Sequence, residues 1–377
     1  MSLVRLRPER LARLPEQYFG KIVGRAAAAA ALPGEPVVDL GRGSPEVGPP
    51  AHVVERLAEA ARHPSAHGYA PFRGLPSLRE AIALRYRDVY GVELDPEREV
   101  AIVPGTKTAI IELVFCLAEA GETMLIPDPW YPDYLSGPAL AGVHVETLPL
   151  DPEAGWAPDF DATPAAAVVY LCYPSNPVGV CAPEGVFAAT VRYAERTGAA
   201  IVHDFAYGDL VFDGRKPQSF LAEPGAKEVG VEMFSMSKSY GMAGWRVGFV
   251  VGNAEIVDRI NLLNDHCRVG MFAPVQEASV AALTGPQDSV AERAAAYQRR
   301  GARVSAELGA PLSEATYYVW FRLPEAWSTK RLLEETRVAI APGEGFGPSG
   351  LGWARSSTAV TDDVLETGLE RLARALA

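Results

Sequence analysis

The sequence predicts an α/β protein whose mostly parallel sheet is covered by helices on both faces. From about Glu99 onward, short runs rich in Val, Ile and Leu alternate with longer helical runs. Several of these runs, such as AAAVVYLCY at 165–173, are almost continuously apolar, which is typical of strands that are buried on both faces. The chain has 377 residues, of which 48% are hydrophobic, so it can bury a large core.

The expected elements follow one another in order. We expect strands at 99–105, 123–128, 144–150, 165–173, 199–205, 228–236 and 245–252. We expect helices at 106–121 and 186–198. Because parallel strands need long connections that usually contain a helix, this order predicts a sheet flanked by helices.

A second, smaller α+β domain is expected from the two ends of the chain. The C-terminal part carries helices, one aromatic strand at 317–323 and a Gly-rich loop. We assign residues 46–268 to the large domain, and residues 1–45 plus 269–377 to the small domain.

Charge and cysteine content limit the partners and the compartment. The net charge of −12 argues against binding to nucleic acid or to an anionic membrane surface. The N-terminus has no continuous apolar segment typical of a signal peptide, and the four cysteines form no CxxC pair. The six histidines lack the spacing of metal ligands. We therefore expect a cytoplasmic protein without a metal site.

The most specific segment is SMSKSYGMAGWRVGFVVG at 235–252, where Lys238 follows an expected strand. An amine that forms a Schiff base must be unprotonated and held in place. The hydroxyls of Ser235 and Ser237 and the guanidinium of Arg246 suit a phosphate group. A solvated surface lysine is the alternative, and this segment alone leaves it open.

Three further motifs lie at the ends of expected strands. Asn176 begins an Asn-Pro-x-Gly turn, and Asp204 ends a strand three residues before Tyr207. Gly, Thr and Lys at 105–107 lie where a strand leads into a helix, which is a typical anion site. Each motif also has an ordinary structural explanation as a turn or a helix cap.

Together and in this order, the motifs make the chain resemble the class I/II aminotransferases of pyridoxal 5′-phosphate (PLP) fold type I. The resemblance runs from DLGRGSPE at 39–46 to GWAR at 352–355. It is strongest to the bacterial branch of aspartate, LL-diaminopimelate and methionine-salvage aminotransferases. The segments that carry it are LPEQYF, GYAPFRGLPSLREAIA, PDPWYPDY, HDFAYGDLVFDGRKPQSFL and MAGWRVGFVVGN.

The resemblance implies PLP as the cofactor and gives roles to the residues around its ring. Lys238 would form the Schiff base and later move a proton, and Asp204 would pair with the pyridine nitrogen. Asn176 and Tyr207 would bind the 3-oxygen of the ring. Tyr131 would stack on the ring face.

The resemblance also implies residues for the phosphate and the substrate. The cofactor phosphate would lie among Gly105, Thr106, Lys107, Ser235, Ser237 and Arg246. Tyr69 would reach the phosphate of a neighbouring subunit, which implies a homodimer with shared active sites. Arg355 would hold the substrate α-carboxylate, with Gly41 beside it and Asn176 nearby.

Three residues depart from the usual pattern of the branch. Trp130 is expected to narrow the substrate pocket. Arg42 or Arg268 would add a second cation and favour a substrate with a distal negative group. The alternative is that both arginines face solvent and pair with carboxylates.

The resemblance implies transfer of an amino group from a small amino acid to a 2-oxo acid. The route would pass through a Lys238 Schiff base and pyridoxamine phosphate. The alternative is a PLP-dependent lyase, or an enzyme that replaces groups at Cβ or Cγ and builds a carbon skeleton in a specialised biosynthetic pathway. Both reactions use the same cofactor residues, so the motifs leave both open.

Overall fold

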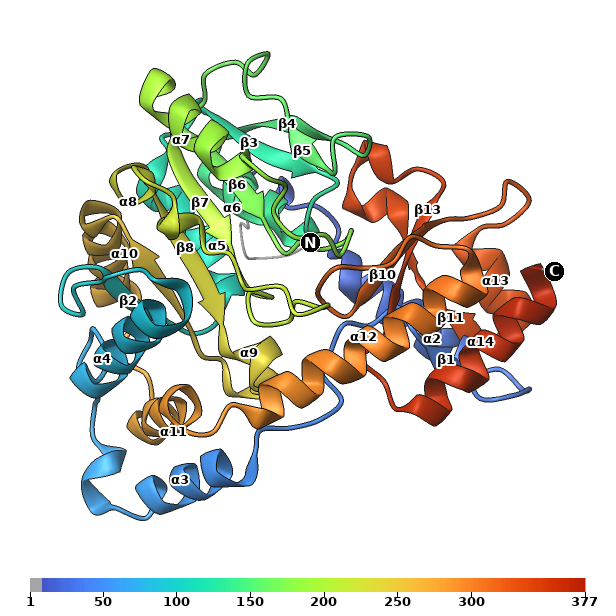
Figure 1. Cartoon of the computed structure of the whole chain (residues 1–377), viewed down its shortest axis with the longest axis horizontal. Coiled ribbons are helices and arrows are strands. Elements are labelled where there is room, and N and C mark those ends of the chain that lie inside the picture. Colours follow the sequence, from blue (N-terminus) through green and yellow to red (C-terminus); the bar gives the residue numbers. More distant parts are fainter. Residues whose placement is uncertain (1–8, 377) are drawn as a thin grey trace, which may run out of the picture.

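A computed structural model describes residues 9–376 and contains a central eight-stranded sheet (Figure 1). The strand order is β2-β9-β8-β7-β6-β3-β4-β5. The strands are β2 (Val100–Val103), β3 (Thr123–Asp128), β4 (His144–Asp151), β5 (Ala157–Pro158), β6 (Val168–Cys172), β7 (Ala200–Asp204), β8 (Gly230–Ser235) and β9 (Gly248–Gly252). In the middle of the sheet, the neighbouring strands β4, β3, β6, β7 and β8 are all parallel. Strand β9 is antiparallel to both of its neighbours, β8 and β2. The expected mostly parallel sheet is confirmed.

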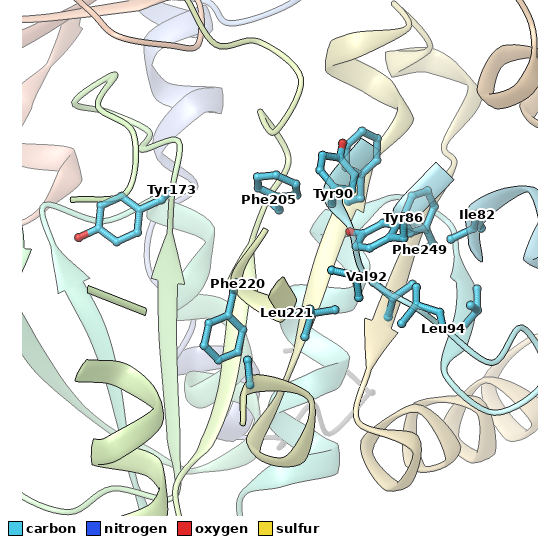
Figure 2. Close-up of a cluster of buried hydrophobic side chains, with 14 of the residues drawn as sticks. Ile82, Tyr86, Tyr90, Val92, Leu94, Tyr173, Phe205, Phe220, Leu221 and Phe249 are labelled. Carbon is cyan, nitrogen blue, oxygen red and sulfur yellow. The ribbon is translucent and has the colours of Figure 1, made fainter. Parts of the chain in front are cut away.

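Helices cover both faces of this sheet. On one face, α5 (Thr106–Leu117) and α10 (Ala254–Cys267) pack their apolar side chains against the strands. On the other face lie α4 (Pro76–Arg85), α7 (Val186–Thr197) and α11 (Ala273–Thr284). Figure 2 shows part of this second layer, where the rings of Tyr90 and Phe205 lie 5.3 Å apart. Each Val, Leu, Ile, Phe or Met side chain that is fully buried in these layers contributes about 1.5–3 kcal/mol relative to exposure.

The two ends of the chain meet in a second group of elements, at the right of Figure 1. Strands β10 (Tyr318–Arg322), β13 (Trp353–Ser357) and β12 (Ala341–Pro342) form an antiparallel sheet. Strand β1 (Val38–Asp39) pairs in parallel with β11 (Val338–Ala339). Helices α13 (Thr329–Thr336) and α14 (Asp362–Leu376) pack against β11, and α2 (Tyr18–Ala30) packs against α13.

The long helix α12 (Asp288–Leu308) connects the two groups (Figure 1). Val290 near its start belongs to the core beside the large sheet, and Val304 belongs to the core around β1 and α14. Helix α11 packs against α4 and against α3 (Ala51–Ala61). The exact division of the chain at residues 45/46 and 268/269 stays a prediction.

The expected helices end earlier than the patterns suggest. Helix α5 ends at Leu117 rather than at 121, because Ala118 is already extended. Among residues 9–376, no helix is both long and apolar enough to cross a membrane.

Candidate active site

A cavity of about 450 Å³ lies where several strands of the large sheet end. Cys172, Asp204 and Ser235 are the last residues of β6, β7 and β8, and all three line it. Ligands of open α/β sheets bind at this edge. Twelve residues that the sequence predicted line the cavity: Gly41, Arg42, Thr106, Lys107, Tyr131, Asn176, Asp204, Tyr207, Ser235, Ser237, Lys238 and Arg246.

Lys238 lies on the short helix α9 (Met236–Ser239), directly after β8. Its Nζ lies 5.6 Å from the centre of the Tyr317 ring and 5.8 Å from that of Tyr207. Burial lowers the pKa of the Lys238 amine, and the charges of Arg355 and Arg246 lower it further. A lowered pKa increases the fraction of neutral amine, which is the nucleophilic form.

Asp204 is buried at the carboxyl end of β7 and is held by two hydrogen bonds. The Tyr134 hydroxyl donates to Oδ2 at 2.8 Å, and the Ala206 N–H donates to Oδ1 at 3.2 Å. Burial raises the pKa of Asp204, and the bond from Tyr134 opposes this rise. Tyr134 was not among the residues predicted from the sequence, although it lies in the PDPWYPDY segment that carries Tyr131.

The cavity has a strongly electropositive end at the start of α5. No side chain of the described residues caps this helix, so the N–H groups of Thr106 and Lys107 are available to an anion, whereas that of Thr108 donates to the Gly105 carbonyl. Gly105 precedes the helix with a φ of +83°, and an added Cβ would lie 2.3 Å from Nη2 of Arg246. The positive φ therefore favours glycine, and any larger residue would displace the Arg246 guanidinium. Together with the hydroxyls of Ser235 and Ser237, these donors suit a phosphate dianion.

Arg355 lies on β13, directly behind the cavity wall, and is fully buried. Its Nη1 donates to Oδ1 of Asn176 at 2.7 Å, and its Nη2 donates to the Gly41 carbonyl at 3.1 Å. The guanidinium lies 3.8 Å from the centre of the Tyr318 ring, and Tyr318 itself lines the cavity. Arg355 thus contacts lining residues but does not line the cavity itself.

Three other residues singled out from the sequence lie elsewhere. Tyr69 is 90% exposed and does not line the cavity of its own chain. Trp130 does not line the cavity, and its backbone N–H donates to the Phe346 carbonyl at 2.7 Å, which ties this residue to the loop at 343–350. The guanidinium of Arg268 pairs with Glu112, so Arg268 also lies outside this cavity.

Nine further residues line the cavity and were not predicted from the sequence. They are Phe19, Ile22, Val23, Gly43, Ser44, Ile110, Cys172, Ala206 and Tyr318. Burial raises the pKa of the Cys172 thiol to about 12, which disfavours the thiolate form. The only available signals were the apolar face of α2 and the nearness of Gly43 to Gly41 in DLGRG.

The arrangement fits PLP. A neutral lysine amine, a buried carboxylate and an anion site share one cavity, as the aldehyde, the pyridine nitrogen and the phosphate of this cofactor require. Two glycines keep the backbone close to the anion site. Besides Gly105, a Cβ on Gly248 would lie 3.1 Å from the Thr106 nitrogen.

Comparisons with known proteins give a consistent result. The family profile "Aminotransferase class I and II" matches residues 35–372. The chain is 41% identical to L-glutamine–4-(methylsulfanyl)-2-oxobutanoate aminotransferase of Bacillus subtilis, over 97% of this chain and 95% of that protein. It is 37% identical to LL-diaminopimelate aminotransferase of Dehalococcoides mccartyi, over 97% of each chain. The structure of substrate-bound BacF from Bacillus subtilis superposes with a TM-score of 0.93 at 36% identity, covering 99% of this chain and 98% of that one.

These relatives are named aminotransferases, and nothing in the comparisons supports the lyase alternative. The observed sheet and its flanking helices agree with PLP fold type I. The chain therefore belongs to the class I and II aminotransferases and is a PLP-dependent enzyme that moves an amino group from an amino acid to a 2-oxo acid.

Proposed function

We propose that Lys238 is the residue that holds PLP covalently and then moves a proton on the substrate. When bound, PLP supplies an aldehyde that condenses with amines and a ring that withdraws electrons from the substrate Cα. The lowered pKa of Lys238 supports this role, because a neutral amine can attack the aldehyde and later accept the Cα proton. The observation that carries the proposal is that this amine shares one cavity with Asp204 and Arg246.

Four neighbouring residues would orient the cofactor ring. Asp204 would accept a hydrogen bond from the protonated pyridine nitrogen, and this bond would keep the nitrogen charged. Asn176 and Tyr207 would bind the 3-oxygen, and Tyr131 would cover one face of the ring. All four side chains line the cavity.

The electropositive end would hold the cofactor phosphate. Its donors would be the α5 N-terminus and the side chains of Thr106, Lys107, Ser235, Ser237 and Arg246, and Gly105 would keep the backbone close. Lys107 also pairs with Asp133 at 2.9 Å, so its charge would be shared.

The opposite end would hold the substrate α-carboxylate. Arg355 would bind it through its planar guanidinium, with Gly41 and Asn176 keeping the arginine in position. Because Arg355 is fully buried behind Tyr318, a small displacement of the Tyr318 ring would accompany substrate binding.

We further propose that the enzyme is a cytoplasmic homodimer with shared active sites. Tyr69, Phe72 and Phe272 expose large apolar side chains on segments near one another, as a subunit interface would require. Tyr69 would reach the phosphate bound by the partner subunit. All four cysteines are free thiols, which agrees with a reducing compartment.

The experiment that tests the proposed function combines labelling with turnover. The purified enzyme would be loaded with PLP, reduced with borohydride and digested, and mass spectrometry should find the cofactor on the peptide that contains Lys238. With an amino acid and a 2-oxo acid, the unreduced enzyme should produce the exchanged pair. Lys238→Ala should lose both signals. Turnover that persists in Lys238→Ala, or label on another lysine, would contradict the proposal.

A further inference from the structure

We propose that Arg42 binds the anionic end of the substrate side chain, so that the enzyme prefers dicarboxylic amino acids such as glutamate over their neutral amides. This inference rests on the proposed function, because it places the substrate α-carboxylate at Arg355. Arg42 would then determine whether the enzyme prefers a substrate with an acidic or with a neutral side chain.

The position of Arg42 is fixed relative to Arg355. The Gly41 carbonyl accepts a hydrogen bond from Arg355, and consecutive Cα atoms lie only about 3.8 Å apart. The N–H groups of Gly41 and Arg42 donate to the same Asp39 oxygen, at 2.9 and 3.2 Å. The side chain of Arg42 therefore starts from an anchored loop, and it lines the cavity next to the proposed carboxylate site.

Arg42 is an exposed cation without a side-chain partner among residues 9–376. Its side chain makes no hydrogen bond or ion pair with any residue in 9–376, whereas Lys107 pairs with Asp133. Asp204 is the one carboxylate among the described lining residues, and it would serve the cofactor ring. After the phosphate and the α-carboxylate are bound, the positive charge of Arg42 is still uncompensated.

The wall near Arg42 suits the carbon chain of such a substrate. Helix α2 contributes Phe19, Ile22 and Val23 to the cavity. Methylene groups would pack on these apolar side chains while a terminal carboxylate reached the guanidinium. Because Arg42 is exposed, water and salt would partly screen the ion pair.

The experiment compares donors in the first half of the reaction, so that no acceptor has to be chosen. The PLP-loaded enzyme is mixed with glutamate or with glutamine, and the loss of the PLP absorption gives kcat/KM for each donor. Wild type should prefer glutamate. Arg42→Gln should lower kcat/KM for glutamate about tenfold, which corresponds to about 1.4 kcal/mol, and leave the value for glutamine within about twofold. Arg42→Lys should keep most of the preference, because it keeps the charge.

Arg299→Gln is the matched control, because Arg299 is an exposed arginine of α12 outside the cavity. It should leave both values unchanged. As a measurement without turnover, calorimetry with glutarate should show weaker binding to Arg42→Gln than to wild type. Higher salt should reduce this difference, because it screens an accessible ion pair.

Three outcomes would overturn the inference. One is an unchanged glutamate-to-glutamine ratio in Arg42→Gln, and another is a wild type that prefers glutamine. The third is a ratio that falls in Arg268→Gln but not in Arg42→Gln, since the anion would then belong to Arg268. Failure of the proposed function can be distinguished from failure of this inference. Wild type would then exchange no amino group with any donor, but the binding of glutarate would still report on Arg42.

Discussion

Lys238 and Asp204 lie in one cavity, and burial shifts the pKa of each toward its neutral form. Holding these two ionisable groups away from water therefore lowers the folding stability of the cofactor-free protein. Bound PLP would remove both destabilising effects. The Lys238 amine would be in a covalent bond to the cofactor, and the Asp204 carboxylate would accept a hydrogen bond from the pyridine nitrogen. Cofactor binding and folding stability should thus be coupled.

Removal of the lysine amine should stabilise the cofactor-free protein. At pH 7, Lys238→Met should have a higher free energy of unfolding than wild type, because it removes a buried amine. The pKa of Lys238 in the folded protein lies below its unfolded value of about 10.4. At pH values between these two pKa values, the unfolded state therefore binds more protons than the folded state. Wild type should regain stability as the pH rises through this range, and its difference from the variant should shrink.

Urea unfolding at pH 7 and near pH 10 measures this difference. Lys216→Met, at an exposed lysine outside the cavity, is the control and should show no such change with pH. A difference between Lys238→Met and wild type that stays constant or grows would contradict the assigned direction of the pKa shift.

Loss of the Tyr134 hydroxyl should weaken the hold on PLP. Tyr134→Phe removes the donor to Oδ2 of Asp204 and raises the pKa of this carboxyl further, so its bond to the pyridine nitrogen weakens. A hydrogen bond to a charged group contributes about 1.5–3 kcal/mol, and the part of it that keeps Asp204 ionised is lost, so the dissociation constant of PLP should rise up to about tenfold.

Equilibrium dialysis gives this constant, and Tyr170→Phe is the control. Tyr170 is equally buried and its ring lies 5.3 Å from that of Tyr134, but its hydroxyl donates to the Ile110 carbonyl. Tyr170→Phe should lower stability without changing PLP affinity. Equal losses of affinity in both variants would mean that Tyr134 acts through packing alone.

At the scale of elements, the strands and the residues at their ends were predictable. Apolar runs indicated β6, β7 and β8, and the family resemblance implied that Asn176, Asp204 and Lys238 surround one cofactor ring. Phe19 on α2 and Tyr318 on β10 were not predictable. Their side chains reach the cavity only because elements from both ends of the chain pack beside the large sheet, and no local pattern encodes that packing.

The start of α5 should depend on its glycine for ligand binding. Gly105→Ala places a Cβ against Arg246 and forces a positive φ on alanine, which costs about 1–2 kcal/mol. We expect PLP affinity to fall about tenfold, because Arg246 must shift. Gly198→Ala is the matched control, since Gly198 has a φ of +76° and nothing within 4 Å of an added Cβ.

Chemical denaturation and cofactor titration separate the two effects. Both alanine variants should lose stability through backbone strain, and only Gly105→Ala should lose PLP affinity. Retention of full affinity by Gly105→Ala would show that Arg246 tolerates the displacement.

At the scale of the whole molecule, shared sites predict complementation between inactive subunits. Tyr69→Ala and Lys238→Ala should each be nearly inactive alone. In a mixed dimer, one site would combine an intact Lys238 with an intact Tyr69 from the other subunit. After random subunit exchange, half the dimers are hybrids with one of two sites restored, so activity should reach about one quarter of wild type.

Activity after mixing that equals the average of the separate variants would contradict shared sites. Sedimentation analysis of the same samples would report whether dimers are present. Lys238→Ala mixed with itself through the same unfolding and refolding steps controls for the treatment.

The pairing of β1 with β11 also determines when the protein can be completed during synthesis. The large sheet needs no residue beyond Gly252, so it can form while the ribosome is still translating the C-terminal third of the chain. Val38 and Leu40, in contrast, stay without their packing partners until Val338 and Leu369 have emerged. A nascent chain of this enzyme therefore carries its earliest strand uncovered for most of translation, and a premature stop near the C-terminus would leave that strand uncovered for good.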